Sequence, residues 1–428
     1  MKINTENRTY EEVLALPRLQ HKNPRRPSRL LATVVRLASI PTLAKTKFTY
    51  TTEGMEKVGK EPCLILMNHS SFTDMKLAFG IFYPKPMGIV TSVDGMSGIL
   101  GKLMRLLGCT PTHKFITDLT LIRDLEYMLK VNKTNVLMYP EAGYSFDGTT
   151  TTLPRKLGVL MKKLGVPVVT VITQGAFHRD PLYNMLQIPK VKVSAHVKCI
   201  ATAEEVKEKS VEELDALLDE AFSFDNFAWQ RDNKIEIDVP YRADGLHRIL
   251  YKCPHCGAEN QMEGKGIHLT CHACQKQWTM DVYGQLVANE GETEYPHIPD
   301  WYKWQRACVR EELEKGEYAL DTEVDIAIQV NLNGVCKVGK GRLTHNENGF
   351  HLTGAEGKLN YSQSAVFSHT LYADYYWYEI GDVIGIGNNE FSYFCFPEKD
   401  VSVTKVRLAT EELYKMKKQQ RRSKKETE

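Results

Sequence analysis

A histidine and an aspartate five positions apart, directly after an apolar run, can carry out acid–base chemistry. His69 and Asp74 follow the run 63–67. A carboxylate on one ring nitrogen fixes the tautomer of an imidazole, and the other nitrogen can then take a proton from a substrate. We therefore expect His69 to be a general base that Asp74 orients. The alternative is structural, because Ser71 and Asp74 also fit a helix capping box.

A second polar cluster, Pro-Glu-Ala-Gly-Tyr-Ser at 140–145, follows another apolar run at 136–138. Glu141 and Ser145 offer a carboxylate and a hydroxyl, and Gly143 permits close approach of the backbone. An ordinary strand-to-loop turn is the alternative. Because no serine or cysteine stands in a nucleophile-elbow context, direct attack by a substrate hydroxyl is favoured over a covalent enzyme intermediate.

Both clusters follow expected buried strands, and open α/β sheets bind substrates beyond the carboxyl ends of their strands. The pattern predicts strands at 48–51, 63–67, 88–91, 136–139, 167–172 and 191–197, and helices at 72–82, 119–131, 157–164 and 204–222. Strands that alternate with helices in this way indicate an α/β fold.

The length of 428 residues allows two or three domains. We expect an α/β domain over 1–245, a small cysteine-bearing module over 246–290 and a β-rich domain over 315–428. Turn signals at 348–349 and 388–389 support the last of these. Its strands, followed by a C-terminal helix and a basic tail, resemble a pleckstrin-homology or GRAM-type module.

Four cysteines form two Cys-x-x-Cys pairs: Cys253, Cys256, Cys271 and Cys274. Pairs at this separation can deliver four thiolates to one tetrahedral Zn²⁺ ion, so we predict a zinc ribbon. Four cysteines leave no open coordination position, and the metal should therefore be structural. Redox chemistry at one pair is the alternative. No run of basic and aromatic residues adjoins the module, so we expect no nucleic acid as a partner. A zinc ribbon that binds nucleic acid is the second alternative function.

Basic residues concentrate at both ends of the chain. Residues 13–52 contain eight Lys and Arg and no Asp or Glu, and a second basic run occupies 415–425. Residues 28–40 plot as a basic amphipathic helix, which favours contact with an anionic membrane surface. Such a helix can also pack on the protein's own core, and a basic tail can simply be solvated.

The first residues are polar, and no stretch reaches the roughly 18 apolar residues that a bilayer span needs. We therefore expect neither a signal peptide nor a membrane span. Together with the basic ends, this predicts a cytoplasmic protein that associates peripherally with a membrane.

The two polar clusters resemble the motifs of the glycerolipid acyltransferases, a family that includes 1-acylglycerol-3-phosphate acyltransferase. Asn68-His69 with Asp74, the aromatic-Pro-Glu of 139–141 and the Val-Pro-Val of 166–168 carry the resemblance, which covers 45–200. It implies a glycerol-3-phosphate acyltransferase-like α/β sandwich.

The resemblance also implies the reaction. His69 would deprotonate the hydroxyl of a lipid acceptor, Asp74 would orient His69, and the hydroxyl would attack the thioester of acyl-CoA or acyl carrier protein. The acceptor-binding residues that we predict are Asn68, Lys114, Glu141, Gly143 and Ser145.

The chain departs from the family pattern at the second cluster. The motif Phe-Pro-Glu-Gly-Thr-Arg-Ser is changed at 139, 142, 143 and 144, so Tyr144 replaces the arginine. Lys114 best matches an upstream arginine but lacks its bidentate fork. Whether the acceptor is phosphorylated, as in 1-acyl-sn-glycerol-3-phosphate, stays open, with Arg155, Lys156 and Arg179 as compensating candidates. The alternative function is a non-catalytic lipid- or protein-binding adaptor built on the same fold.

Overall fold

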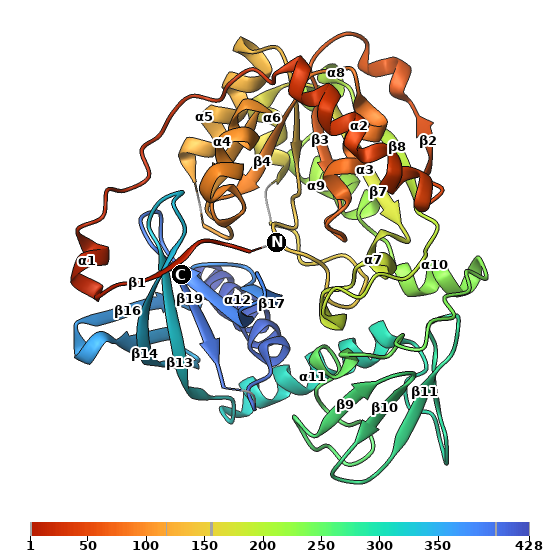
Figure 1. Cartoon of the computed structure of the whole chain (residues 1–428), viewed down its shortest axis with the longest axis vertical. Helices are drawn as coiled ribbons and strands as arrows, with labels where there is room; N and C mark the ends of the chain where they lie inside the picture. Colours follow the sequence, from red (N-terminus) through yellow and green to blue (C-terminus); the bar gives the residue numbers. More distant parts are fainter. Residues whose placement is uncertain (1, 117, 155–156, 399, 428) are drawn as a thin grey trace. The chain divides into compact units, whose positions relative to one another are not determined.

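The computed structural model describes residues 2–116, 118–154, 157–398 and 400–427, without the side chains of 422 and 424–427. The chain divides into two compact units (Figure 1). We call Gln20–Pro181 with Ile188–Trp229 the α/β unit, and Met1–Leu19, Leu182–Gln187 and Gln230–Glu428 the β-rich unit. The three domain ranges expected from the sequence stay a prediction.

The α/β unit is built on one seven-stranded sheet in the order β2-β8-β7-β3-β6-β4-β5. All neighbouring strands run parallel except β7 and β8, which are antiparallel. The strands are β2 (Thr49–Glu53), β3 (Leu64–Met67), β4 (Met87–Ser92), β5 (Cys109–Thr112), β6 (Asn135–Met138), β7 (Val168–Gln174) and β8 (Ser194–Ala201).

Helices connect and cover these strands. They are α2 (Arg29–Lys45), α3 (Asp74–Phe82), α4 (Gly98–Leu106), α5 (Leu119–Glu126), α6 (Leu157–Leu164), α7 (Ala176–Arg179), α8 (Ala203–Glu208), α9 (Val211–Ala221) and α10 (Asn226–Asp232). Leu64 and Leu66 of β3 share a core with apolar side chains of α6 and α9. Because side chains alternate along a strand, Ile65 and Met67 point to the opposite face of the sheet. The mixed α/β class is confirmed, while the specific sandwich stays a prediction.

The pairing of β3 with β6 brings the two polar clusters together. Leu66 lies opposite Met138 in this parallel ladder, so both strands end at the same edge of the sheet. The segments 68–74 and 139–145 leave from that edge. The sequence argument for one shared site therefore rests on an observed register.

Several elements of the α/β unit differ from the sequence expectation. The helix expected at 204–222 is two helices, because a capping box between Ser210 and Glu213 starts α9 anew. The helix expected at 119–131 ends in a π-helical turn at Tyr127–Val131. Strand β5 and helix α4 were not expected.

The β-rich unit contains an eight-stranded sheet, which confirms a β-rich C-terminal part. Its main path is antiparallel in the order β16-β15-β14-β13-β19-β18-β17, and β1 pairs with β14. The more specific pleckstrin-homology or GRAM assignment stays a prediction. The elements are β1 (Thr5–Asn7), α1 (Tyr10–Leu14), β13 (Leu320–Gln329), β14 (Val335–Asn346), β15 (Gly349–Gly354), β16 (Leu359–Ser364), β17 (Tyr372–Trp377), β18 (Gly381–Gly387), β19 (Ser392–Pro397) and α12 (Val403–Thr427).

A four-stranded antiparallel sheet in the same unit carries the cysteine pairs. It consists of β9 (Met262–Lys265), β10 (His268–Cys271), β11 (Gln277–Met280) and β12 (Leu286–Ala288). Helix α11 (Ile298–Lys315) packs against it through Trp301, whose ring meets that of Trp278 edge-on at 5.1 Å. Both tryptophans are fully buried, so this contact forms a core for a very small module.

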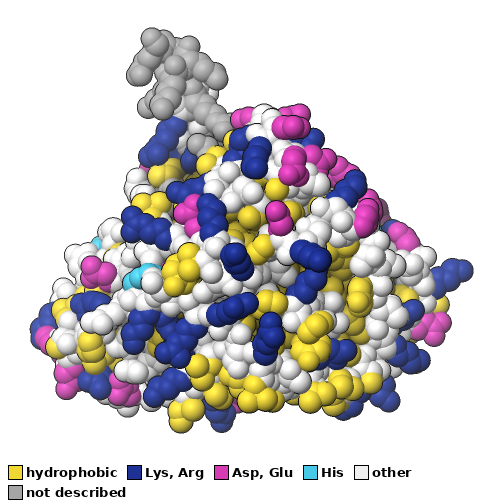
Figure 2. All heavy atoms as spheres, turned by 90° about the horizontal axis from the view of Figure 1, so that it is seen from above, with side chains coloured by type: hydrophobic (Ala, Val, Ile, Leu, Met, Phe, Trp, Pro, Cys, Tyr) yellow, Lys and Arg dark blue, Asp and Glu magenta, His cyan; other side chains and the backbone are white. Residues whose placement is uncertain are grey.

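The surface of the chain mixes apolar and basic side chains. In the view of Figure 2, hydrophobic side chains lie directly beside many Lys and Arg side chains. No helix in the described part of the chain combines the length and the apolar character that crossing a bilayer requires.

We predict that buried His178 makes the α/β unit sensitive to acid. Burial lowers the pKa of His178 to about 4, and its Nε2 lies 2.8 Å from the carbonyl oxygen of Asn226. An unfolded histidine has a pKa near 6.5, so between these values the unfolded chain binds the extra proton. Stability should therefore fall on acidification from pH 6.5 to 4, by about 3 kcal/mol from this residue.

Denaturant unfolding at a series of pH values measures this effect. His178→Gln, which keeps an amide donor but does not titrate, should show a shallower loss of stability than the wild type. Equal pH dependence of the two proteins would show that His178 contributes nothing.

Candidate active site and metal cluster

His69 and Asp74 form the hydrogen-bonded pair expected from their spacing. His69 Nδ1 lies 2.9 Å from Oδ2 of Asp74, at the start of α3. The same oxygen accepts the backbone N–H groups of Ser70 and Ser71, at 2.9 and 3.1 Å. A carboxylate that accepts three donors leaves the proton on Nδ1, so Nε2 of the neutral imidazole is the basic atom. Asp74 thus caps the 70–74 turn and orients His69 at once.

The backbone of His69 is held on both sides by the second polar cluster. Its N–H donates to Oε2 of Glu141 at 2.9 Å, and its carbonyl accepts the N–H of Ser145 at 3.2 Å. The other oxygen of Glu141 accepts the N–H and hydroxyl of Thr151, at 2.8 and 3.1 Å. Ser145 Oγ donates to the carbonyl of Thr149. Glu141 and Ser145 therefore position His69, and their contact with an acceptor stays a prediction.

Asn68 is fully buried and joins β3 to β7. Its Oδ1 accepts the N–H and hydroxyl of Thr173, at 2.7 and 3.0 Å, and its Nδ2 donates to Ser70 Oγ and to the carbonyl of Thr173. These bonds use both ends of the amide within the fold. The geometry supports a structural role, and the predicted acceptor contact is not tested.

Asp180, which sequence reasoning did not single out, supports the same turn from outside. This buried carboxylate accepts the hydroxyl of Ser71 and the N–H of Phe72, the latter at 3.0 Å, and pairs with Arg179. Burial raises the pKa of Asp180, and the nearby charge of Asp74 adds to the increase. The only sequence signal was its place after the carboxyl end of β7.

The electrostatic setting keeps His69 neutral. Burial lowers the pKa of His69 below its ordinary value, against the hydrogen bond and charge of Asp74, which act to raise it. The positive charge of Lys114 lowers the pKa further. Lys114 is thus close enough to act on the site electrostatically, although its contact with an acceptor stays a prediction.

Two tyrosine rings cover the faces of the His69 imidazole. The ring centroid of Tyr139 lies 4.2 Å from that of His69 and the centroid of Tyr144 lies 3.9 Å away, with interplanar angles of 23° and 28°. The ring centroid of Phe72 lies 5.2 Å from that of Tyr144. The side chain of His69 remains 18% exposed. Two of the four changed residues of the second motif therefore enclose the histidine.

Two further changed positions shape the 139–145 loop. Ala142 has a φ of 53°, a left-handed conformation that favours the glycine of the family motif. A Cβ at Gly143 would lie 3.3 Å from the ring of Phe115, so a larger residue here would require that ring to shift by a few tenths of an ångström. The contact of Gly143 with an acceptor, expected from the sequence, stays a prediction. Arg179 is paired with Asp180, and Arg155 and Lys156 lie outside the described residues.

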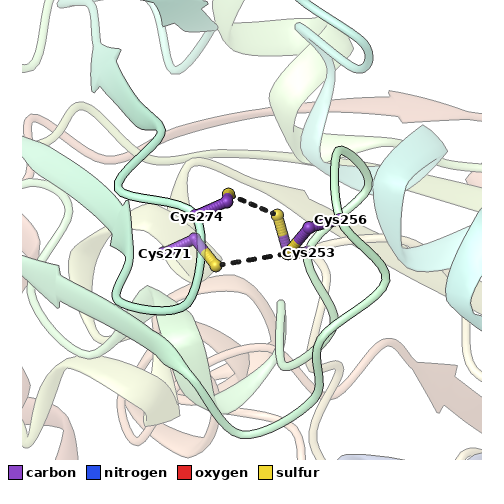
Figure 3. Close-up of side chains that lie close together, drawn as sticks. All are labelled: Cys253, Cys256, Cys271 and Cys274. Atoms are coloured by element: carbon purple, nitrogen blue, oxygen red, sulfur yellow. Dashed lines mark hydrogen bonds between the residues drawn. The ribbon is translucent and has the colours of Figure 1, made fainter.

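The four predicted cysteines converge in the β-rich unit. Their Sγ atoms all lie within 4.8 Å of one another, with 3.8 Å between Cys253 and Cys274 and 3.7 Å between Cys256 and Cys271. Figure 3 shows Cys253 and Cys256 on one segment of the chain, facing Cys271 and Cys274 on another. The distances are far longer than the roughly 2 Å of a disulfide. They fit the edge of about 3.8 Å that four sulfurs form around one tetrahedral metal ion.

The comparisons with known proteins agree with the location of the His69 site. Residues 49–174 match the family model described as Acyltransferase. None of the curated proteins compared with the chain matches it. A matching solved structure is that of the 1-acyl-sn-glycerophosphate (LPA) acyltransferase PlsC from Thermotoga maritima. It has 19% sequence identity and a TM-score of 0.35, and covers 45% of this chain and 80% of that one.

A TM-score of 0.35 is too low to carry an argument, so the assignment depends on the family model. That model spans both polar clusters and the strands β3 and β6 that bring them together. The match therefore supports an acyltransferase domain at residues 49–174.

Proposed function

We propose that the α/β unit is an O-acyltransferase that moves a fatty acyl group from a thioester to a lipid hydroxyl. The observation that carries the proposal is the His69–Asp74 pair, held at the carboxyl edge of the sheet inside the acyltransferase match. Among the described residues, none hydrogen-bonds Nε2 of His69. This nitrogen is therefore free to receive the proton of an acceptor hydroxyl.

The reaction follows from that proton transfer. As Nε2 takes the hydroxyl proton, the oxygen attacks the thioester carbonyl and forms a C–O bond. Collapse of the tetrahedral intermediate breaks the C–S bond, and the imidazolium returns its proton to the leaving thiolate. The products are an ester and a free thiol. A base that burial keeps neutral stays active on the acidic side of an ordinary histidine's pKa.

The acceptor and the donor are the finer parts of the proposal. The donor is acyl-CoA or acyl carrier protein, and 1-acyl-sn-glycerol-3-phosphate is the first acceptor to test. Lys114 supports an anionic acceptor through its charge near His69. Tyr144 stands where the family motif has an arginine, so the chain lacks that positive charge. Neutral lipid alcohols should therefore be tested as acceptors in the same assay.

The altered 139–145 motif favours a second candidate function, that of a lipid- or protein-binding adaptor without acyltransferase activity. In that case the pair of His69 and Asp74 would serve only to stabilise the turn before α3. Thiol release from acyl-CoA with mixed lipid acceptors separates the two functions, because an adaptor releases none.

We expect His69→Ala to reduce acyl transfer by at least about 100-fold, because general base catalysis contributes roughly 10²–10⁴ in rate. The measurement is thiol release from acyl-CoA with lipid acceptors. His196→Ala is the matched control, since His196 is an exposed histidine of the same unit on β8. A folded His69→Ala protein with wild-type activity would remove the mechanism.

We also propose that the four-cysteine cluster binds structural zinc. When bound, the ion would hold the two loops together and leave no open position for catalysis. The residues that would hold it are Cys253, Cys256, Cys271 and Cys274, whose sulfur spacing supports the assignment.

Purified protein should contain one zinc ion per chain, measured by elemental analysis. Cys256→Ser should lose the zinc and lower the unfolding temperature of the β-rich unit, because the ligand set becomes incomplete. Cys308→Ser, an isolated cysteine on α11, should keep both. Wild-type zinc content in the Cys256→Ser protein would refute the four-cysteine assignment.

Helix α2 supports the proposal of peripheral membrane association. One side of α2 packs on α3. A Cβ at Gly80 of α3 would lie only 3.1 Å from the side chain of Leu43, and Ser39 is the buried residue of α2. An apolar stripe at i, i+4 and i+7 stays exposed, with Leu30 at 75% and Leu37 at 58%. Thus α2 packs on the core and still offers an apolar face.

The start of α2 is hydrogen-bonded to the end of α4, a second helix with exposed apolar residues. The N–H of Ser28 donates to the carbonyl of Leu106 at 3.0 Å. Ile99 and Leu103 of α4 are exposed as well. Exposed Arg25, Arg26 and Arg29 lie close to Ser28 in the sequence, so the surface suits anionic phospholipid.

We expect Leu30→Ser combined with Leu37→Ser to weaken binding to anionic phospholipid vesicles at least about tenfold, because each buried leucine contributes roughly 1.5–3 kcal/mol. Vesicle cosedimentation measures this. Val287→Ser is the control, because Val287 is an apolar residue of β12 that is 51% exposed. Unchanged binding of the double variant would exclude α2 as the contact.

A further inference from the structure

The most unusual feature of the site is the stacking of two aromatic rings on one imidazole. Tyr139 leaves the end of β6 and covers one face of His69, and Tyr144 covers the other from the loop that follows. The hydrogen bond to Asp74 lies in the plane of the imidazole at Nδ1. The faces and one edge are thus occupied by the chain itself, and the Nε2 edge remains.

We propose that Tyr144 is a positioning residue for His69. Its ring closes the second face of the imidazole against Tyr139, so that an acceptor hydroxyl reaches the histidine only along the Nε2 edge. This inference rests on the proposed function, in which His69 is the base. It goes beyond it by assigning a task to the position where the family motif has an arginine.

Three observations support a task for the ring itself. The backbone of Ser145 donates to the carbonyl of His69, so the residue after Tyr144 is tied to the residue that Tyr144 covers. The ring of Phe72 contacts that of Tyr144, with 5.2 Å between their centroids, and limits its movement. Ala142 adopts a left-handed conformation two residues earlier, which costs an alanine about 1–2 kcal/mol and indicates that the loop is held in this shape.

The stack should have two consequences for the imidazole. It restricts rotation of the ring, which keeps Nδ1 on Asp74 and Nε2 directed outwards. It also keeps water from both faces, in agreement with a His69 pKa that burial lowers. Loss of the Tyr144 ring should therefore change both the turnover rate and the pH at which His69 gains a proton.

Tyr144→Ala and Tyr144→Phe test the proposal as a matched pair, with the full-length protein and its zinc content as isolated. We expect Tyr144→Ala to lower kcat about 10- to 100-fold with little change in KM for the acyl thioester. The pKa of His69, followed by NMR titration of the imidazole, should rise towards its ordinary value. Tyr144→Phe keeps the ring and should restore both quantities.

Tyr144→Leu provides a second test if the alanine variant does not fold. Leucine fills space without a flat face, so we expect it to behave as alanine does. A wild-type His69 pKa and kcat in Tyr144→Leu or Tyr144→Ala would overturn the proposal, as would a Tyr144→Phe protein as impaired as Tyr144→Ala. Absence of acyl transfer by the wild type would instead refute the proposed function, and the NMR titration would still decide whether the ring sets the pKa of His69.

Discussion

The site depends on one short turn, in which Oδ2 of Asp74 accepts His69 Nδ1 and two backbone N–H groups. A single carboxylate oxygen thereby fixes the turn, the tautomer of the imidazole and the start of α3. Everything else around the site supports that turn. Glu141 and Ser145 hold the backbone of His69, and Asp180 holds Ser71 and Phe72. Three buried carboxylates, those of Asp74, Glu141 and Asp180, thus support the segment that carries His69.

The second polar cluster takes on a different meaning once the structure is known. Its glutamate and serine resemble acceptor-binding residues in sequence, yet both bond to the chain itself. Its tyrosines, which break the family motif, are the residues that enclose the imidazole. The motif has thus changed without loss of the register between β3 and β6 that holds it beside His69. These bonds support the proposed acyltransferase, and the identity of its acceptor stays part of that proposal.

Short-range sequence patterns predicted the features that depend on neighbouring residues. The strands 63–67 and 136–139, the His69–Asp74 pair and the cysteine knuckles were all found where short-range spacing placed them. Asp180 was missed because its partner Ser71 lies 109 positions away, and spacing carries no information at that range. The stacking of Tyr144 on His69 was missed because it depends on the pairing of β3 with β6, which brings together two residues 75 positions apart in the sequence. The capping box of Ser210 and Glu213 could have predicted the start of α9. It was missed because the helical spacing of apolar residues continues from α8 into α9.

The central claim is that His69 draws its proton from an acceptor alcohol, and not from water. Thiol release and ester formation, measured together in one reaction of the wild-type protein with acyl-CoA and lipid acceptors, test this most directly. The account predicts that thiol appears only when an acceptor is present, with one ester formed for each thiol released. Thiol release at the same rate without any lipid alcohol would contradict it, since the protein would then be a thioester hydrolase.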